Sequence, residues 1–144
     1  MSDQVSRVRE KVRQILTQKF NVGVDSDGDY TVAYESAQGW IRVLPISDDG
    51  EKTVVRVEAP LLFGVKETDE LYKYVAIHTD DYMFGHLSLA ATPDGMMVMF
   101  VHTLLGNYLD EEELLAAVIG VVGSGNDLDD KLQGMFGGRR YSEV

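Results

Sequence analysis

The residues best suited to metal chemistry form an acidic run near position 27. Asp25-Ser26-Asp27-Gly28-Asp29 places carboxylates at alternate positions, as the start of a calcium loop does. An EF-hand loop also needs glycine at its sixth position and glutamate at its twelfth, where this chain has Tyr30 and Ser36. The run also leads into a predicted strand instead of joining two helices. We therefore interpret it as an acidic loop and predict no metal site there.

The three histidines would bind zinc only if the fold brought them together. A catalytic zinc site needs three protein ligands and an open position for water. His78, His86 and His102 show neither His-x-His nor His-x-x-x-His spacing. His86 and His102 could face each other across a hairpin, because the turn near Pro93 lies midway between them. We interpret them as a packed cross-strand pair and predict neither a metal nor another cofactor.

Acid–base, nucleophilic and nucleotide chemistry have no better candidates. Asp80-Asp81 is typical of a solvated turn, and the acidic run 110–113 is typical of a helix N-terminus, so neither predicts a buried acid with a raised pKa. The chain has no cysteine and therefore no thiolate nucleophile. Gly120, Gly123 and Gly125 lie in a helical pattern and predict close packing, not a dinucleotide turn. The sequence predicts no catalytic residue and no enzyme.

Length and charge restrict the partners. The chain has 144 residues, which is enough for one domain over 1–144 with a substantial core. Residues 1–20 carry five basic and two acidic side chains, which is a net charge of +3. Because the whole chain carries −11, residues 21–144 carry −14. A body this acidic repels phosphate, and we expect no nucleic-acid partner. The basic first helix is either a solvated face or docks on the acidic body or on an acidic partner.

Apolar runs long enough for a signal peptide or a membrane span are missing from the sequence. No stretch reaches the roughly 20 apolar residues that a membrane span needs. We therefore expect a soluble cytoplasmic protein with no membrane partner.

The periodicity of apolar residues predicts the elements that must position these side chains. Spacing of three and four predicts helices, alternation predicts strands, and Gly, Pro and Asp mark the turns between them. The predicted order is a helix over 3–20, strands over 29–35, 40–46 and 53–63, a helix over 68–78, strands over 84–91 and 96–104, and a helix from Asp110 to Gly137-Gly138. Short hairpin links predict an α+β fold with three helices and a mostly antiparallel, five-stranded sheet.

Single residues refine this pattern. The first two strands are predicted to turn at 37–39. Pro60 cannot donate to a strand ladder, so pairing should loosen there or the strand should lie at an edge. Asp110 is the predicted N-cap of the last helix, with Glu113 in capping-box position and Leu114 as part of a hydrophobic staple. The glycines of 123–125 weaken this helix, since each costs about 1 kcal/mol relative to alanine.

The last third of the chain resembles a known family. The segments that carry the resemblance are His102–Leu105, Leu109–Leu115, Asn126–Leu132 and Phe136–Gly138. They resemble the bacterial YbjN-like proteins, described as sensory transduction regulators, and the element order is similar to the type III secretion chaperone-like fold. The resemblance implies a small non-enzymatic protein that binds a protein or peptide and forms a homodimer. Gly123-Ser124-Gly125 departs from the family pattern, in which the helix continues.

Two groups of side chains are candidates for contact with a partner. Strand 96–101 is apolar on both faces, so we expect Met97 and Met99 to lie either in an ordinary core or beneath a bound peptide or second subunit. Trp40 shares a predicted strand face with Arg42. That pairing is typical of an interface centre and equally of a surface residue covered by an arginine stem.

These observations predict a non-enzymatic protein- or peptide-binding domain with a chaperone-like or regulatory role. An extended peptide could lie on the sheet or add to its edge. The alternative is a small-molecule sensor or an enzyme with a pocket between the sheet and the last helix. Convergent polar groups with shifted pKa values would indicate that alternative. A third interpretation is a homodimer without a client.

Overall fold

The computed structural model describes residues 3–144, so the first two residues of the predicted domain 1–144 lie outside it. The α-helices are α1 (Asp3–Leu16), α2 (Asp69–His78) and α3 (Glu111–Phe136), and a 3-10 turn, η1 (Tyr141–Glu143), follows them. The strands are β1 (Gly23–Val24), β2 (Tyr30–Tyr34), β3 (Ala37–Pro45), β4 (Thr53–Val65), β5 (His86–Thr92) and β6 (Gly95–Leu105). The predicted order is confirmed. The sheet has six strands and not the predicted five. The additional strand is β1, which the sequence did not predict because both of its residues are exposed and leave no alternating pattern.

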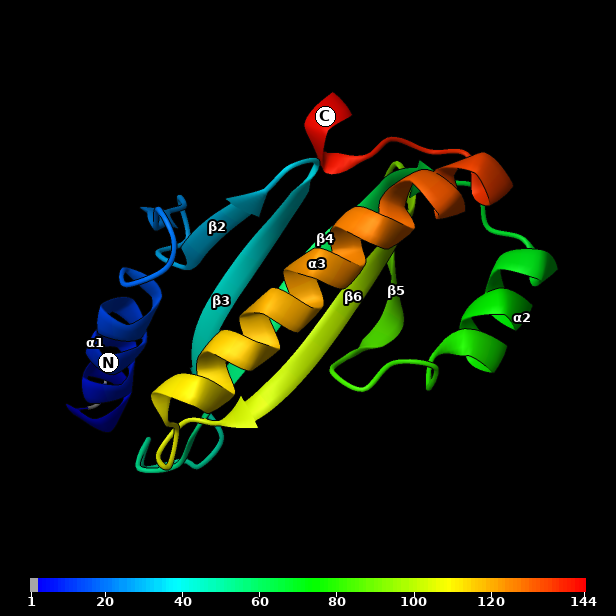
Figure 1. The fold of residues 1–144 in the computed structure, drawn as a ribbon. Helices are drawn as coiled ribbons and strands as arrows, with labels where there is room; N and C mark the ends of the chain where they lie inside the picture. Colours follow the sequence, from blue (N-terminus) through cyan, green and yellow to red (C-terminus); the bar gives the residue numbers. More distant parts are fainter. Residues whose placement is uncertain (1–2) are drawn as a thin grey trace.

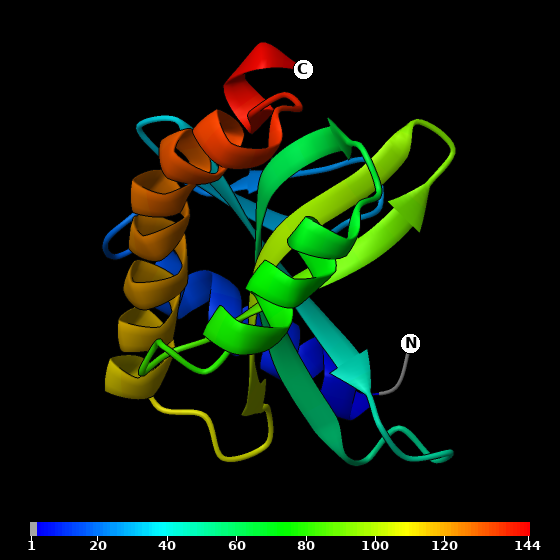
Figure 2. The same cartoon turned by 90° about the vertical axis from the view of Figure 1, so that its right-hand side faces the viewer.

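The strands form one antiparallel sheet in the order β1-β2-β3-β4-β6-β5. The long helix α3 runs across this sheet in Figure 1, with α1 beside β3 and α2 beyond β5. In Figure 2, α3 stands to the left of the sheet, and no α-helix of residues 3–144 covers the opposite side. The sheet therefore has one helix-covered face and one open face.

The covered face contains the core. The stripe of α1 is buried over Val5, Val8, Val12, Ile15 and Leu16, as the spacing predicts. Helix α3 approaches the sheet closely at Gly125, where an added Cβ would lie 3.1 Å from the Cβ of Ala59 on β4. Gly39 of β3 is similarly close, because an added Cβ would meet Val122 of α3 at 2.6 Å. Glycine on both elements thus lets the helix lie directly on the strands.

Helix α1 ends four residues earlier than predicted. After Leu16 the amide of Gln18 bonds to the carbonyl three residues back, at Ile15, and the hydroxyl of Thr17 donates to the carbonyl of Gln14. These local bonds tighten the chain into a turn. Phe20 remains partly buried against the core although it lies outside the helix.

The boundaries of α3 agree with the prediction. Asp110 caps the helix, and its carboxylate accepts a hydrogen bond of 2.7 Å from the amide of Glu113. Leu109 and Leu114 are both buried on either side of the cap. The helix runs unbroken through Gly123 and stops at Gly137, whose φ is 73°. Burial of the apolar stripe on the sheet outweighs the cost of the interior glycines.

The predicted turn at 37–39 is wrong. Tyr34 pairs with Ala37, so the β2–β3 hairpin turns at Glu35 and Ser36, with Glu35 at a φ of 52°. The amide and the hydroxyl of Ser36 lie 3.2 and 2.8 Å from Oδ1 of Asn126, and the hydroxyl lies 2.7 Å from the carboxylate of Asp129. Both partners belong to α3, so a contact distant in sequence selects the turn.

Pro60 loosens the sheet without lying at its edge. β4 is central, between β3 and β6, and its pairing with β6 shifts register between Pro60 and Leu62. The first of the two predicted outcomes is therefore confirmed. The irregularity accommodates a residue without an N–H donor, and Leu61 and Leu62 are both fully buried beside it.

Candidate functional site

The helix-free side of the sheet carries the candidate site. We call this side the open face. Alternate residues of the central strands point to it, and they are Trp40, Arg42 and Leu44 of β3, Arg56 and Glu58 of β4, and Met97 and Met99 of β6. Trp40 is opposite Glu58, and Pro60, two residues further along β4, is opposite Met99. The strands of Trp40 and Met99 are therefore about 10 Å apart on one surface.

Trp40 is half-buried on the open face, and it shares this face with Arg42 as predicted. Its ring packs edge-on against Tyr141 of η1, with 6.4 Å between the ring centroids. Sequence reasoning missed this neighbour, since the two residues are 101 positions apart in the sequence. A partner role for Trp40 remains a prediction.

A charged group occupies the middle of the open face. The carboxylate of Glu58 is almost buried and accepts hydrogen bonds from Arg56 at 2.8 Å and from Arg42 at 3.3 Å. Arg42 also lies 3.3 Å from the carboxylate of Asp29. A guanidinium has five N–H groups, so both arginines are held in place and keep donors for a further acceptor.

The acidic loop lies beside this group. A hollow of about 490 Å³ opens here, lined by Arg9, Asp25, Asp27, Asp29, Trp40, Arg42, Val43, Leu44 and Glu58. The hairpin register explains the approach: Tyr30 pairs with Ile41, which brings the preceding Asp29 next to Arg42. The β2–β3 register was the sequence signal that could have located this neighbour, and the wrong turn obscured it.

The three loop aspartates lie close together because of the turn in which they lie. Their carboxylates lie within 4.8 Å of one another, and Asp25 accepts hydrogen bonds from the amides of Asp27 and Asp29 at 2.9 and 3.0 Å. Burial raises the pKa of Asp29, an effect that the neighbouring Arg42 opposes and that Asp25 and Asp27 reinforce. The loop leads into β2, so it has neither the helices nor the ligand spacing of an EF-hand.

The two predicted methionines lie on the open face. Met97 is half-buried and Met99 is buried, whereas Val98 and Phe100 on the other side of β6 are fully buried in the core. β6 is thus apolar on both sides, as the sequence indicates, although no α-helix within residues 3–144 covers the methionines. Their part in binding remains a prediction.

The predicted pairing of the two strand histidines is wrong by one residue. Thr92 pairs with Gly95 around a two-residue turn, so His86 is opposite Val101 and His102 points to the covered face. His102 lies edge-on to Phe84, with 5.9 Å between the ring centroids. Burial lowers the pKa of His102, and the proximity of His86 lowers it further.

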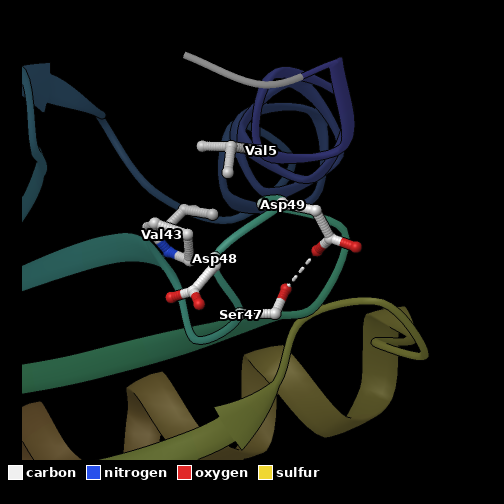
Figure 3. Close-up of a pocket in the computed structure, with 7 residues that line it drawn as sticks. Val5, Val43, Ser47, Asp48 and Asp49 are labelled. Carbon is white, nitrogen blue, oxygen red and sulfur yellow. Dashed lines mark hydrogen bonds between the residues drawn. The ribbon is translucent and has the colours of Figure 1, made fainter.

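The predicted alternative required a pocket of polar groups between the sheet and α3. Gly125 and Gly39 bring the helix directly onto the strands at that interface. A hollow of about 270 Å³ remains between α3 and Tyr34 of β2, and Asp127 is the one charged residue of its lining. Another hollow lies between α1 and the β3–β4 turn, where Val5 and Val43 form an apolar wall (Figure 3). Its polar side chains stabilise the turn itself: Ser47 donates to Asp49 at 2.7 Å, and this bond lowers the pKa of Asp49.

None of the described helices is long and apolar enough to span a membrane.

The open face, the unbroken α3 and the antiparallel sheet can now be compared with known proteins. The family model for type III secretion (YopN, CesT) and YbjN peptide-binding chaperones, TY-Chap1, matches residues 3–144. The chain belongs to this family. The predicted resemblance is therefore confirmed, and so is the predicted protein- or peptide-binding function.

Two solved structures share the fold. One is the ExsC–ExsE complex, with a TM-score of 0.62 and 13% identity, covering 90% of this chain and 96% of the other. The second is the Yersinia pestis type III secretion chaperone SycH in complex with a stable fragment of YscM2, with a TM-score of 0.51 and 15% identity, covering 86% and 98%. No curated protein matches the chain significantly. The likeness confirms the α+β chaperone fold.

Proposed function

We propose that the open face binds an extended segment of a client protein, with Trp40, Arg42, Met97 and Met99 as contacts. One observation carries this proposal. The open face, which no α-helix of residues 3–144 covers, presents a half-buried tryptophan and two methionines. Aromatic and arginine side chains anchor interfaces, and methionine adapts to different partners. Membership of a peptide-binding chaperone family supports the same function.

The charges of the open face give the segment an orientation. Arg42 and Arg56 are fixed by Glu58 and keep unused N–H groups, which suit a carboxylate or a backbone carbonyl of the client. The apolar anchors then flank a polar centre. β5 offers a second mode of contact, because it is the outer strand of the sheet and pairs only with β6 on its inner side.

The chain catalyses no reaction in this proposal. Groups with shifted pKa values are dispersed over the molecule; among them, Asp29 lies in the acidic loop, Asp49 in the β3–β4 turn, and His102 on the covered face. An acid and a base that act together would have to converge on one substrate position. We propose that this binding unit, residues 1–144, acts in the cytoplasm, a compartment with which a chain without disulfides is compatible.

Random peptides displayed on phage, selected on the immobilised protein, test the site. We expect Trp40→Ala to weaken binding of the selected peptides by at least about tenfold, the size expected of an anchoring aromatic. Ile119→Ala is the matched control, because Ile119 is exposed on α3, on the other side of the sheet. Equal affinities of the wild type and Trp40→Ala would place the binding site elsewhere.

We propose in addition that α2 forms the contact of a homodimer. Only Leu71 of this helix is buried, and Ile77 is 59% exposed beside the half-exposed Met135 of α3. A hollow between the two helices, lined in part by Tyr74 and Phe136, continues this apolar surface. Ile77→Glu should convert the dimer to a monomer in analytical ultracentrifugation. A wild-type protein that sediments as a monomer at high concentration would contradict the proposal.

A further inference from the structure

The segment that follows α3 returns to the sheet and adds to β4. Arg139 and Phe63 exchange two backbone hydrogen bonds, each amide donating to the other carbonyl at 2.8 Å. Phe63 lies beyond Glu58, the last β4 residue paired with β3. Gly138 permits the close approach, since an added Cβ would lie 2.8 Å from the carbonyl oxygen of Phe63. The segment 139–144 thus occupies a stretch of strand edge that β3 leaves free.

The same segment places an aromatic ring on the open face. Tyr141 lies edge-on to Trp40 and tilted against Phe63, with 6.4 and 6.5 Å between ring centroids. Trp40 is one of the contacts of the proposed client site. The segment therefore combines the two contacts expected of an extended ligand, which are backbone pairing with a strand and a side-chain anchor.

The side-chain contacts that hold the segment in place lie at the surface of the protein. No residue of η1 is buried. Arg140 forms ion pairs with Asp130 and Glu143, and Glu143 also accepts a hydrogen bond from Gln133, all at the surface. Exposed ion pairs contribute little and weaken as salt is added. A segment held in this way is readily displaced by a ligand with better contacts.

We propose that segment 139–144 occupies the client's anchor position and that a client displaces it. This inference rests on the proposed function of the open face and names the chemistry of its ligand. The ligand is an extended peptide with an aromatic side chain, which replaces Tyr141 between Trp40 and Phe63 while its backbone replaces Arg139 beside Phe63. The affinity for the client is then set partly by how firmly the segment is held.

Trp40 reports directly on this exchange, because it is the only tryptophan of the chain. We expect a chain that ends at Gly138 to show Trp40 emission at longer wavelength than the full chain. A synthetic peptide with the sequence of residues 137–144 should reverse the shift saturably. The same peptide with Tyr141→Ala should bind at least about tenfold more weakly, as expected for loss of an aromatic anchor.

Peptides selected from the phage library provide the second readout. Those that bind the chain ending at Gly138 should contain an aromatic residue, compete with the 137–144 peptide, and bind the full chain several-fold more weakly. Added salt should reduce this difference in affinity between the shortened and the full chain, because salt weakens the ion pairs that hold the segment. In the full chain, Tyr141→Ala should raise their affinity, whereas Tyr108→Ala, at an exposed tyrosine in the β6–α3 loop, should not.

Equal affinity of the full and shortened chains for peptides that need Trp40 would overturn this inference and leave the proposed function intact. Selected peptides that bind independently of Trp40 would overturn both. If the shortened chain does not fold, the comparison of Tyr141→Ala with Tyr108→Ala in the full chain still decides, since an unchanged affinity in Tyr141→Ala contradicts displacement.

Discussion

The two faces of the sheet differ in what they contribute. Along β3, residues that point towards α3 are buried, whereas the alternate residues on the open face are half-buried. Ile41 is fully buried, and its neighbour Trp40 is available to Tyr141 and to solvent. One strand therefore stabilises the fold with one half of its side chains and presents a binding surface with the other half. Substitutions that separate stability from binding test this division.

The largest effect is expected where α3 covers the sheet. Leu114→Asp places a charge at a fully buried position, which should cost more than about 4 kcal/mol and unfold the protein. Ile119→Asp is the matched control on the same helix, because Ile119 is 58% exposed and should change stability by no more than about 0.5 kcal/mol. Thermal melts followed by circular dichroism measure both. A wild-type melting temperature for Leu114→Asp would contradict the assignment of the core.

The next effect compares the two faces directly. Ile41→Ala should lower the free energy of unfolding by about 2–5 kcal/mol, because it leaves a cavity beneath α3. Trp40→Ala should cost about 1 kcal/mol, since this side chain is only partly buried and lies outside the core. Urea denaturation followed by circular dichroism gives both values without using tryptophan emission. Similar losses would mean that Trp40 is a core residue and that the open face is not primarily a binding surface.

The smallest effect concerns pH and the covered face. The pKa of His102 is lowered in the folded protein, mainly by burial, so the unfolded chain takes up this proton first as the pH falls. Stability should therefore decrease below the unfolded-state pKa of about 6.5. His102→Gln should reduce the slope of stability against pH between neutral pH and about pH 5, where the unfolded histidine is charged. An unchanged slope in His102→Gln would contradict this contribution of His102.

Local signals in the sequence were sufficient where the chain itself supplies the contacts. Asp110 and Gly137 delimit α3 because a cap and a left-handed stop depend on neighbouring residues. The β5–β6 hairpin turns near Pro93 as predicted, between Thr92 and Gly95, although its register differs by one residue from the predicted one. Of the candidate site, the shared face of Trp40 and Arg42 followed from alternation along a single strand.

Predictions failed where a residue distant in sequence decides the structure. The β2–β3 turn is selected by Asn126 and Asp129 of α3, which no local pattern at 35–39 reveals. The two-residue strand β1 forms only because β2 offers it an edge. The acidic loop was recognised, but its position beside Trp40 depends on the hairpin register that the wrong turn concealed.

By itself the sequence determined the order of the elements, the helical stripes and the alternation of the strands, because these follow from the periods of helix and strand and from local capping. Only the tertiary structure decided that α3 covers one side of the sheet, that no α-helix of residues 3–144 covers the other, and that the segment after α3 reaches Trp40. The physical reason is that alternation specifies two faces of a strand without specifying what covers each of them. That choice depends on packing between residues far apart in the chain.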